Sequence, residues 1–378
     1  MRGGSKLMTA FGGFYKGKTV LVTGDTGFKG SWLCVWLAHL GAKVVGYSLA
    51  PPTDPSNFKA CRLDERITHV QADIRDYDRL FSVFQEHRPE VVFHLAAQPL
   101  VRLSFEKTRY TFDANVMGTV NALEAARLTG SVQSVVAISS DKCYQNIGTQ
   151  QGYRETDPLG GYDPYSASKA CAELAIAVYR DARFQKAATP QSDLPIASTR
   201  AGNVIGGGDW ACDRIVPDTV RAIAANRDII VRSPDSVRPW QHVLEPLSSY
   251  LWLGALLTRD RKYCSSWNIA PDEDVVPTVQ DVVTGILKRW PGHTRMVIER
   301  DPSFPEAKLL RLNSTKAKEE LGWRAAWGIE RTLDAIVEWY KHFYNGDSKD
   351  MYAFTAQQIE QYTDSASQKG IDWASTTV

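Results

Sequence analysis

Three glycines directly after a short apolar run constrain the fold of this chain more than any other feature. The run KTVLVT, residues 18 to 23, is typical of a buried strand, and SWLCVWLAHLG, residues 31 to 41, has the apolar period of a helix. Between them Gly24, Gly27 and Gly30 form a G-x-x-G-x-x-G turn. Three glycines in seven residues also make ordinary turns, but a strand before them and a helix after them indicate a turn that binds the pyrophosphate of a dinucleotide.

The alternation of strand-like and helical stretches continues through residue 205. The later strand candidates are KVVGYS, THVQAD, VVFHLAA, SVVAISS and PIASTRAGNVIG, and helical patterns separate most of them. Strands that alternate with helices of this kind favour a parallel sheet with helices on both faces. Because crossovers between parallel strands are right-handed, the sequence predicts a doubly wound α/β fold of the Rossmann type.

This regular pattern fades after Gly206. Prolines and tryptophans become frequent there, and strand-like runs are short until SWNIA, residues 266 to 270. The last thirty residues are polar and poorly patterned. We therefore predict four parts: a disordered leader (1–16), a Rossmann domain (17–205 with 244–270), a smaller mixed substrate lobe (206–243 with 271–345), and a peripheral helix and tail (346–378).

Charge and cysteine content exclude several kinds of partner. With 44 Lys and Arg against 43 Asp and Glu, the net charge of +1 gives no overall field that would favour nucleic acid or an anionic membrane. No uncharged stretch reaches the roughly 18 residues of a spanning helix, and the N-terminus lacks an apolar signal core. The six cysteines lack the paired short spacing of metal sites. We expect a cytoplasmic protein with reduced thiols and no metal.

The strand ends leave the choice of dinucleotide open. The second strand ends in GYSLAPP, with no acid before Asp54 to bind the ribose of NAD and no arginine to bind the phosphate of NADP. Asp73 ends the third strand and could accept a hydrogen bond from adenine, although it could equally cap the next helix. The fourth strand ends in small residues, Leu95 to Ala97, which either let the backbone lie against the cofactor or let a helix pack closely.

A hydroxyl, a phenol and an ammonium group follow the fifth strand. SVVAISS ends at Ser140, and DPYSASK then places Tyr165 and Lys169 four residues apart, on one face of a helix. A lysine ammonium beside a tyrosine lowers the pKa of the phenol, which makes the tyrosine a usable base near neutral pH. We predict that the three side chains lie beside the nicotinamide and support hydride transfer.

Together these residues resemble the extended short-chain dehydrogenase/reductase family, over about residues 17 to 345. The resemblance implies a seven-stranded doubly wound sheet with a C-terminal substrate lobe. It also implies a nucleotide sugar as substrate, and a homodimer or higher oligomer formed through helices near 111 to 129 and 164 to 183. We expect NAD as cofactor, because a reaction cycle that begins with oxidation requires the oxidised cofactor. Family membership alone leaves open an epimerase, a reductase or a dehydratase.

Asp141 and Lys142, directly after Ser140, favour a dehydratase. Oxidising a sugar hydroxyl requires only the tyrosine and the cofactor, whereas eliminating water also requires a base and an acid. The alternative, a solvated surface ion pair, would not explain why two charges end a buried strand. An Asp-Lys pair here resembles the 4,6-dehydratases of CDP-glucose and the inverting enzymes of UDP-N-acetylglucosamine. The implied roles are proton removal from C5 by Lys142 and protonation of the leaving C6 hydroxyl by Asp141.

Longer matches resemble the nucleotide-sugar dehydratase branch and imply CDP-glucose as substrate, with dTDP-glucose, UDP-N-acetylglucosamine or 4-epimerisation as alternatives. They include TGFKGSWL, HLAAQPLVRLS, SSDKCY, GGYDPYSASK, RAGNVIGGGDW and RPWQHVLEP. The branch serves deoxysugar biosynthesis, as in lipopolysaccharide O-antigens. The resemblance adds further contacts with the cofactor (Phe28, Ile74, Leu95, Ala96, Ala97, Tyr165 and Lys169) and with the substrate (Gln98 and His242).

The substrate diphosphate should meet an arginine, because a guanidinium matches phosphate oxygens with paired donors. Arg238 is our first candidate and Arg214 the second, and Asn203 could hold a sugar or diphosphate oxygen. One departure from the family pattern is Asp25, where a histidine is typical. We expect an acid so near the pyrophosphate to be unfavourable for cofactor binding.

Overall fold

The computed structural model describes residues 9–149, 151–188, 193–271, 276–299, 310–346 and 350–375. The strands are β1 (Thr19–Thr23), β2 (Lys43–Ser48), β3 (Thr68–Gln71), β4 (Val91–His94), β5 (Ser134–Ile138), β6 (Ile196–Ala201), β7 (Val204–Ile205), β8 (Ile229–Val231), β9 (Gln241–His242), β10 (Ser266–Ile269) and β11 (Met296–Ile298). The α-helices are α2 (Phe28–His39), α3 (Asn57–Ala60), α4 (Tyr77–His87), α5 (Val101–Glu106), α6 (Thr108–Phe112), α7 (Gly118–Thr129), α8 (Pro164–Arg180), α9 (Ala182–Ala188), α10 (Ile215–Ala224), α11 (Leu244–Leu256), α12 (Val279–Arg289), α13 (Thr315–Glu320), α14 (Ile329–Asn345) and α15 (Tyr352–Gln368). Shorter turns are η1 (Ala10–Gly13), η2 (Leu63–Glu65), the π-helical η3 (Asp113–Met117), η4 (Asp141–Cys143), η5 (Arg261–Tyr263) and η6 (Asp372–Ala374).

A seven-stranded parallel sheet forms the centre of the molecule. Its order is β10-β6-β5-β4-β1-β2-β3, and each neighbouring pair runs parallel. The strand order reverses between β1 and β4. In such sheets ligands usually bind in a crevice outside the carboxyl ends of the strands at this point. The predicted doubly wound fold is confirmed.

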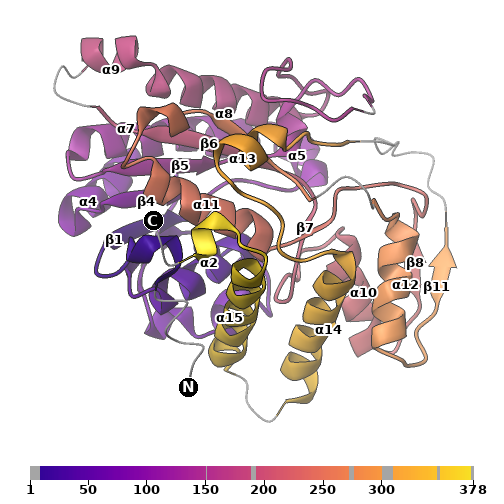
Figure 1. Ribbon diagram of the computed structural model, residues 1–378. Coiled ribbons are helices and arrows are strands. Elements are labelled where there is room, and N and C mark those ends of the chain that lie inside the picture. The colour runs from indigo at the N-terminus through magenta and orange to yellow at the C-terminus, as the bar shows by residue number, and fades with distance from the viewer. Residues whose placement is uncertain are drawn as a thin grey trace.

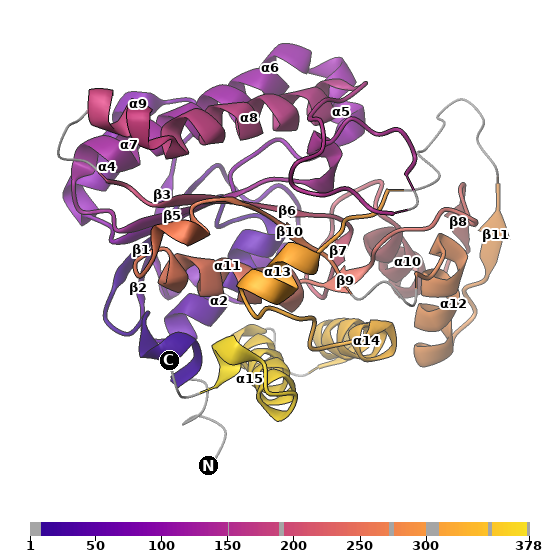
Figure 2. The same cartoon turned by 45° about the horizontal axis from the view of Figure 1, so that its top comes forward.

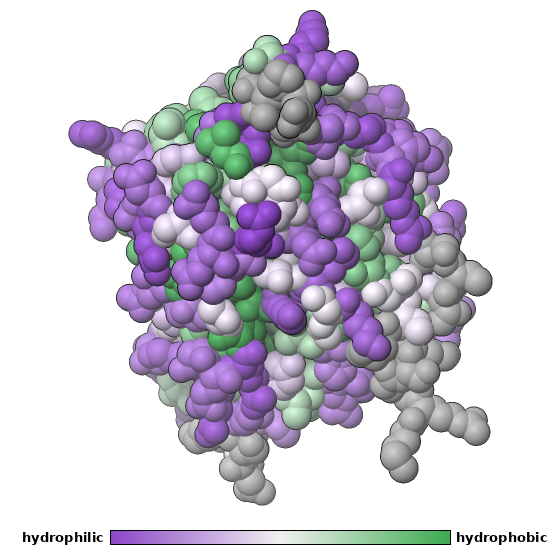
Figure 3. All heavy atoms as spheres, turned by 90° about the vertical axis from the view of Figure 1, so that its left-hand side faces the viewer, coloured by the Kyte–Doolittle hydropathy of each residue, from purple (hydrophilic) through white to green (hydrophobic). Residues whose placement is uncertain are grey.

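Helices cover the sheet on both faces (Figures 1 and 2). Helices α4, α7 and α8 lie on one face, and α2 and α11 lie on the other with α15 beyond them. Helices α10, α12 and α14 form a lobe at the side of the sheet with the small parallel pair β8–β11. Within the described ranges no helix is both long and apolar enough to cross a membrane. The face drawn in Figure 3 is largely hydrophilic, with small hydrophobic patches.

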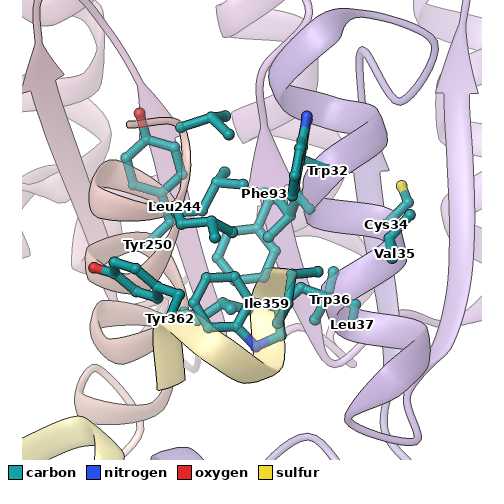
Figure 4. Close-up of a cluster of buried hydrophobic side chains, with 14 of the residues drawn as sticks. Trp32, Cys34, Val35, Trp36, Leu37, Phe93, Leu244, Tyr250, Ile359 and Tyr362 are labelled. Atoms are coloured by element: carbon teal, nitrogen blue, oxygen red, sulfur yellow. The ribbon is translucent and has the colours of Figure 1, made fainter. Parts of the chain in front are cut away.

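The main core lies between α2, α11 and α15 (Figure 4). Trp32 and Trp36 from α2 meet Phe93 from β4, Tyr250 from α11 and Tyr362 from α15, and all five are fully buried. Burying an aromatic side chain of this size stabilises the fold by roughly 2 to 3 kcal/mol. Helix α15 therefore contributes to the core, where the sequence predicted a peripheral helix.

The N-terminal segment also differs from the predicted disordered leader. Phe11 is fully buried and stacks on Trp373 with ring centroids 5.1 Å apart, and the Tyr15 hydroxyl donates to the Leu251 carbonyl at 2.6 Å. The leader prediction gave weight to the glycines and overlooked these two aromatic residues. Residues 1–8 lie outside the described ranges, and the division into domains stays a prediction.

Candidate active site

The glycine turn after β1 is pressed against the backbone that follows β4. Gly24 has a φ of +79°, and a Cβ atom there would lie 2.8 Å from the Ala96 amide nitrogen. A Cβ atom on Gly30 would lie 2.1 Å from the Gly24 carbonyl oxygen. The turn leads into α2 at Phe28, where the amides of the first helical turn have no intrahelical partner. These residues fit the pyrophosphate of a dinucleotide.

The end of β4 is fixed by the hydroxyl of Thr23 on β1. This oxygen accepts hydrogen bonds from the amides of Leu95 at 3.1 Å and Ala96 at 3.2 Å. His94 contacts the same hydroxyl through Nδ1 at 2.8 Å, and burial lowers the pKa of His94 to about 3, so its imidazole is neutral. The small residues through Ala97 therefore present ordered backbone to the crevice.

At the end of β3, Asp73 does not cap the next helix. Asp76 performs that role, because its carboxylate accepts from the Arg79 amide at 3.0 Å. The Asp73 carboxylate instead pairs with the Arg75 guanidinium at 2.7 Å, and this hydrogen bond lowers the pKa of Asp73. Ile74 beside it is buried against Gly118.

Asp25 does not point at the crevice. Its side chain is fully buried, one carboxylate oxygen accepts from the Ser48 hydroxyl at 2.7 Å, and the other meets His69 Nδ1 at 2.7 Å. The carboxylate is thus held by Ser48 and His69, and its effect on cofactor binding stays a prediction. The sequence showed the position of Asp25 in the turn but not the direction of its side chain.

Helix α8 carries Tyr165 and Lys169 to the end of β5. Asp163 caps the helix by accepting from the Ser166 amide at 2.9 Å, and Pro164 occupies its first position. Lys169 Nζ reaches the Ile138 carbonyl at 3.5 Å, and Ser140, Tyr165 and Lys169 are all buried. The structure thus brings the predicted hydroxyl, phenol and ammonium together.

The protonation of this group differs from the expectation. Burial raises the pKa of Tyr165 to about 12, against the opposing effect of a hydrogen bond with Ser140, where we expected Lys169 to lower it. Burial lowers the pKa of Lys169 to about 8, and the carboxylate of Glu173 opposes that change. Desolvation outweighs the pairwise charges at both side chains.

Asp141 is a buried acid, not part of a solvated ion pair. It is 3% exposed, and one oxygen accepts from the Ser140 hydroxyl at 2.9 Å. Its other oxygen has no hydrogen-bond partner in the part of the chain that the structure describes. Burial raises the pKa of Asp141, while the charges of Lys142 and Arg238 and the bond from Ser140 act in the opposite direction. A raised pKa suits a carboxyl group that donates a proton.

Gly202, after β6, makes room for this acid. A Cβ atom on Gly202 would lie 2.0 Å from Asp141 Oδ2. Ser140 caps η4 by accepting from the Lys142 amide at 3.2 Å, so the chain turns directly at the strand end and leaves Lys142 partly exposed. The predicted acid and base therefore lie next to the redox group.

The predicted substrate residues fall into two sets. The charge of Arg238 acts on Asp141 and that of Arg214 acts on Tyr165, so both arginines approach the site, and Arg214 also pairs with Asp209 at 2.9 Å. Asn203 has a φ of +46°, and its buried amide nitrogen has no hydrogen-bond partner among the described residues.

Gln98 and His242 are held by the protein itself. The Gln98 amide donates to the Leu100 carbonyl at 3.0 Å and to the Thr111 hydroxyl at 2.9 Å. His242 is fully buried between the rings of Trp32 and Trp327, at 5.8 and 5.0 Å. Both side chains contact other parts of the protein. A sequence match cannot distinguish such a contact from contact with a ligand.

Two further side chains belong to the site. Burial lowers the pKa of Lys29 to about 7, and the charges of Lys169, Arg214 and Asp141 also act on it, so its ammonium group lies near the site. Glu173, one turn beyond Lys169, forms a buried ion pair with Arg200 at 2.7 Å. The sequence contains a sign of each residue that our prediction overlooked. Lys29 lies within the glycine turn, and Glu173 follows Lys169 by four residues.

The fold and site define a dinucleotide-dependent enzyme with a Ser-Tyr-Lys redox group and an adjacent acid. Residues 21–336 match the family model described as GDP-mannose 4,6 dehydratase. A CDP-glucose 4,6-dehydratase of Salmonella typhimurium is 46% identical over 350 residues, 92% of this chain and 97% of that protein. The chain therefore belongs to this family of nucleotide-sugar dehydratases within the short-chain dehydrogenase/reductases, as predicted.

More distant relatives include UDP-glucose 4-epimerases. A UDP-glucose 4-epimerase of Mycolicibacterium smegmatis is 26% identical, with 85% of this chain and 98% of that protein covered. The structure of UDP-glucose-4-epimerase from Stenotrophomonas maltophila, with bound NAD and formylated UDP-arabinopyranose, is 25% identical with a TM-score of 0.72 and covers 87% of this chain and 99% of that one. The bound NAD in that structure agrees with the predicted cofactor. The predicted enzyme class, an NAD-dependent nucleotide-sugar dehydratase, is confirmed by the Salmonella relative and the family model.

Proposed function

We propose that this chain is an NAD-dependent CDP-glucose 4,6-dehydratase, which converts CDP-D-glucose into CDP-4-dehydro-6-deoxy-D-glucose and water. The observation that carries the proposal is Asp141, a buried acid with a raised pKa hydrogen-bonded to Ser140 of the redox group. An epimerase requires no such acid, because it only rotates the keto-sugar so that hydride returns to its opposite face. The 46% identity to the Salmonella enzyme supports the choice of CDP-glucose among nucleotide sugars.

The residues around the glycine turn would hold the cofactor in this proposal. Gly24, Gly27 and Gly30, with the first turn of α2 at Phe28, would bind the pyrophosphate, and Asp73 and Ile74 would contact the adenine end. The backbone from Leu95 to Ala97 would also contact the cofactor, and Tyr165 and Lys169 would act at the nicotinamide. NAD, when bound, supplies the acceptor of the C4 hydride and the donor of the hydride that reaches C6.

The residues around the sugar move three protons. Tyr165, assisted by Ser140 and by the charge of Lys169, takes the proton of the C4 hydroxyl as C4 becomes a ketone. The ketone acidifies the C5 proton, which Lys142 removes and later returns to C5 as the hydride reaches C6. Asp141 then protonates the C6 hydroxyl, which leaves as water. The raised pKa of Asp141 keeps more of this carboxyl protonated near neutral pH than an ordinary aspartate.

The diphosphate of the substrate meets Arg238 and Arg214 in this proposal, because paired N–H donors match phosphate oxygens. The buried amide nitrogen of Asn203, which has no hydrogen-bond partner among the described residues, could donate to a sugar or diphosphate oxygen. Gln98 and His242 hold these elements in place through the protein contacts described above.

We further infer a homodimer and a cytoplasmic location. Helices α7 and α8 expose Leu128, Leu174 and Val178, and α5 exposes Phe105 close to α8. Pairing these surfaces between two copies would remove apolar area from water. All six cysteines are free thiols, as expected in a reducing compartment, where the enzyme would serve deoxysugar biosynthesis.

A direct test is to incubate the purified chain with NAD and CDP-glucose and to identify the product by mass and NMR. The proposal predicts a 4-keto-6-deoxy sugar nucleotide. Parallel reactions with dTDP-glucose and UDP-N-acetylglucosamine test the substrate. Turnover of UDP-N-acetylglucosamine without turnover of CDP-glucose would contradict the choice of nucleotide, and a C4 epimer would contradict the elimination.

A further inference from the structure

The carboxylate of Asp25 lies at the end of β2, although the residue belongs to the glycine turn after β1. It accepts the hydroxyl of Ser48, the last residue of β2, at 2.7 Å. A Cβ atom on Gly46, two residues earlier in β2, would lie 2.2 Å from Asp25 Oδ2. The glycine in KVVGYS therefore makes room for an acid that arrives from another strand.

An acid is expected at this place in a Rossmann fold that uses NAD. It usually ends the second strand, where it accepts a hydrogen bond from the ribose 2′-hydroxyl, while NADP enzymes place an arginine nearby for the 2′-phosphate. The first acid after β2 in this chain is Asp54, whose side chain is 79% exposed and pairs with Lys59 at 3.3 Å. Asp25 is therefore the buried carboxylate at the end of β2.

Asp25 also fixes the direction of the hydroxyl groups around it. The Ser48 hydroxyl has two acceptors within reach, Asp25 at 2.7 Å and the Leu49 carbonyl at 3.1 Å. The carboxylate is the nearer and stronger acceptor, so the hydroxyl hydrogen points toward Asp25. The neighbouring Thr26 hydroxyl donates to the Leu49 carbonyl at 2.9 Å and lies 2.9 Å from Ser48 Oγ. The Ser48 oxygen also accepts from the Thr26 amide at 3.4 Å. Its remaining lone pair suits a ribose hydroxyl that donates and repels a phosphate oxygen that can only accept.

His69, on β3, holds the second oxygen of Asp25. Its Nδ1 must be the donor in the 2.7 Å contact with the carboxylate. The carboxylate of Asp25 adds a second repulsion against a phosphate group beside Ser48.

We infer that Asp25 selects NAD over NADP by orienting Ser48 as an acceptor for the ribose 2′-hydroxyl and by repelling a 2′-phosphate. The inference rests on the proposed use of NAD. A residue of the glycine turn would then select between NAD and NADP, whereas a residue at the end of the second strand usually does so.

The test is calorimetric titration of the full chain with NAD and with NADP, which measures binding without turnover. The parent protein should bind NAD more tightly. Asp25→Asn keeps the shape, removes the charge and lets the new amide donate to Ser48, which frees the serine hydroxyl to donate outward. The ratio of the two dissociation constants should fall by about tenfold, a difference of about 1.4 kcal/mol.

Asp54→Asn is the matched control, because it removes the only other acid near the end of β2 that the sequence suggests. Its ratio should equal that of the parent. An unchanged ratio in Asp25→Asn, or a relaxed ratio in Asp54→Asn, would overturn the inference while leaving NAD binding intact. Failure of the parent to bind NAD would instead overturn the proposed function together with the inference.

Ser48→Ala keeps the test decisive if Asp25→Asn does not fold, which circular dichroism would reveal. This variant retains the charge and loses the acceptor, so NAD binding should weaken severalfold while NADP binding stays as weak as in the parent. NAD affinity equal to that of the parent would overturn the assigned role of Ser48 and, with it, the inference.

Discussion

Two buried aspartates beside the crevice are held in contrasting ways. At the end of β2, both oxygens of Asp25 have partners, Ser48 and His69. At the end of β5, Asp141 has one partner, Ser140, and its second oxygen has none among the described residues. A buried polar atom without a partner costs free energy and commonly marks a functional site. The comparison assigns orientation and selection to Asp25 and proton transfer to Asp141.

Both acids depend on a neighbouring glycine. Added Cβ atoms on Gly46 and Gly202 would lie 2.2 and 2.0 Å from Oδ2 of Asp25 and of Asp141, respectively. The same local device thus admits a carboxylate at each strand end, and the remaining contacts decide what each carboxylate does.

We expect the largest effect from the loss of Lys142, the proposed base beside Asp141. Lys142→Ala should reduce formation of the 6-deoxy product by about 10²- to 10⁴-fold, the usual contribution of a positioned base, while oxidation at C4 persists. Product formation is followed by mass spectrometry and reduction of the cofactor by its absorbance. Lys59→Ala, which alters an exposed lysine after β2, is the control and should match the parent. Parent-rate release of product by Lys142→Ala would remove Lys142 from the mechanism.

Substitutions of Gly202 and Gly46 should have smaller effects, which separate the roles of the two aspartates. Gly202→Ala displaces Asp141 and should lower turnover by about tenfold or more with little change in NAD affinity. Gly46→Ala displaces Asp25 and should mainly weaken NAD binding. Steady-state kinetics and calorimetric titration of both variants separate these outcomes. If both substitutions changed turnover alone, the two acids would not have separate roles.

The smallest effects concern stability, and they should have opposite signs. Asp25→Asn weakens two hydrogen bonds to a charged group and should lower the free energy of unfolding by about 1 kcal/mol or more. Asp141→Asn removes a buried charge that lacks a second partner, so it should raise the melting temperature near neutral pH. Thermal unfolding of both variants beside the parent tests the pair of signs.

Because the pKa of Asp141 is raised, the stability that Asp141→Asn gains over the parent should depend on pH. Between the ordinary value of 3.8 and the raised value, the folded chain binds more protons than the unfolded chain, so the parent loses stability as pH rises through this window. Asp141→Asn abolishes that loss. Its advantage over the parent should therefore grow with pH above about 4 and vanish below the ordinary aspartate range. An advantage independent of pH would contradict the assigned cause.

The sequence predicted those features that depend on neighbouring residues. The strand and helix around the glycine turn, the four-residue spacing of Tyr165 and Lys169, and the position of Asp141 after Ser140 are all local, and the structure brings them together. The direction of Asp25 depends on Ser48 and His69, which lie 23 and 44 residues away. A local pattern contains no information about such contacts.

The same reason explains the misjudged ends of the chain. Phe11 stacks on Trp373 from the far end of the sequence and also packs against Tyr15 and Trp36. His242 matched a family stretch, yet its burial between two tryptophans appears only in the folded molecule. The pKa of Tyr165 was misjudged because a sequence reveals charged neighbours more readily than the extent of burial.

The central claim is that Asp141 is the acid of the elimination, and Asp141→Asn tests it most directly. The variant is mixed with CDP-glucose and NAD in a single turnover, while cofactor absorbance and product mass are followed together. We predict reduction of the cofactor without loss of water from the sugar. Release of the 6-deoxy product at the parent rate would contradict the account.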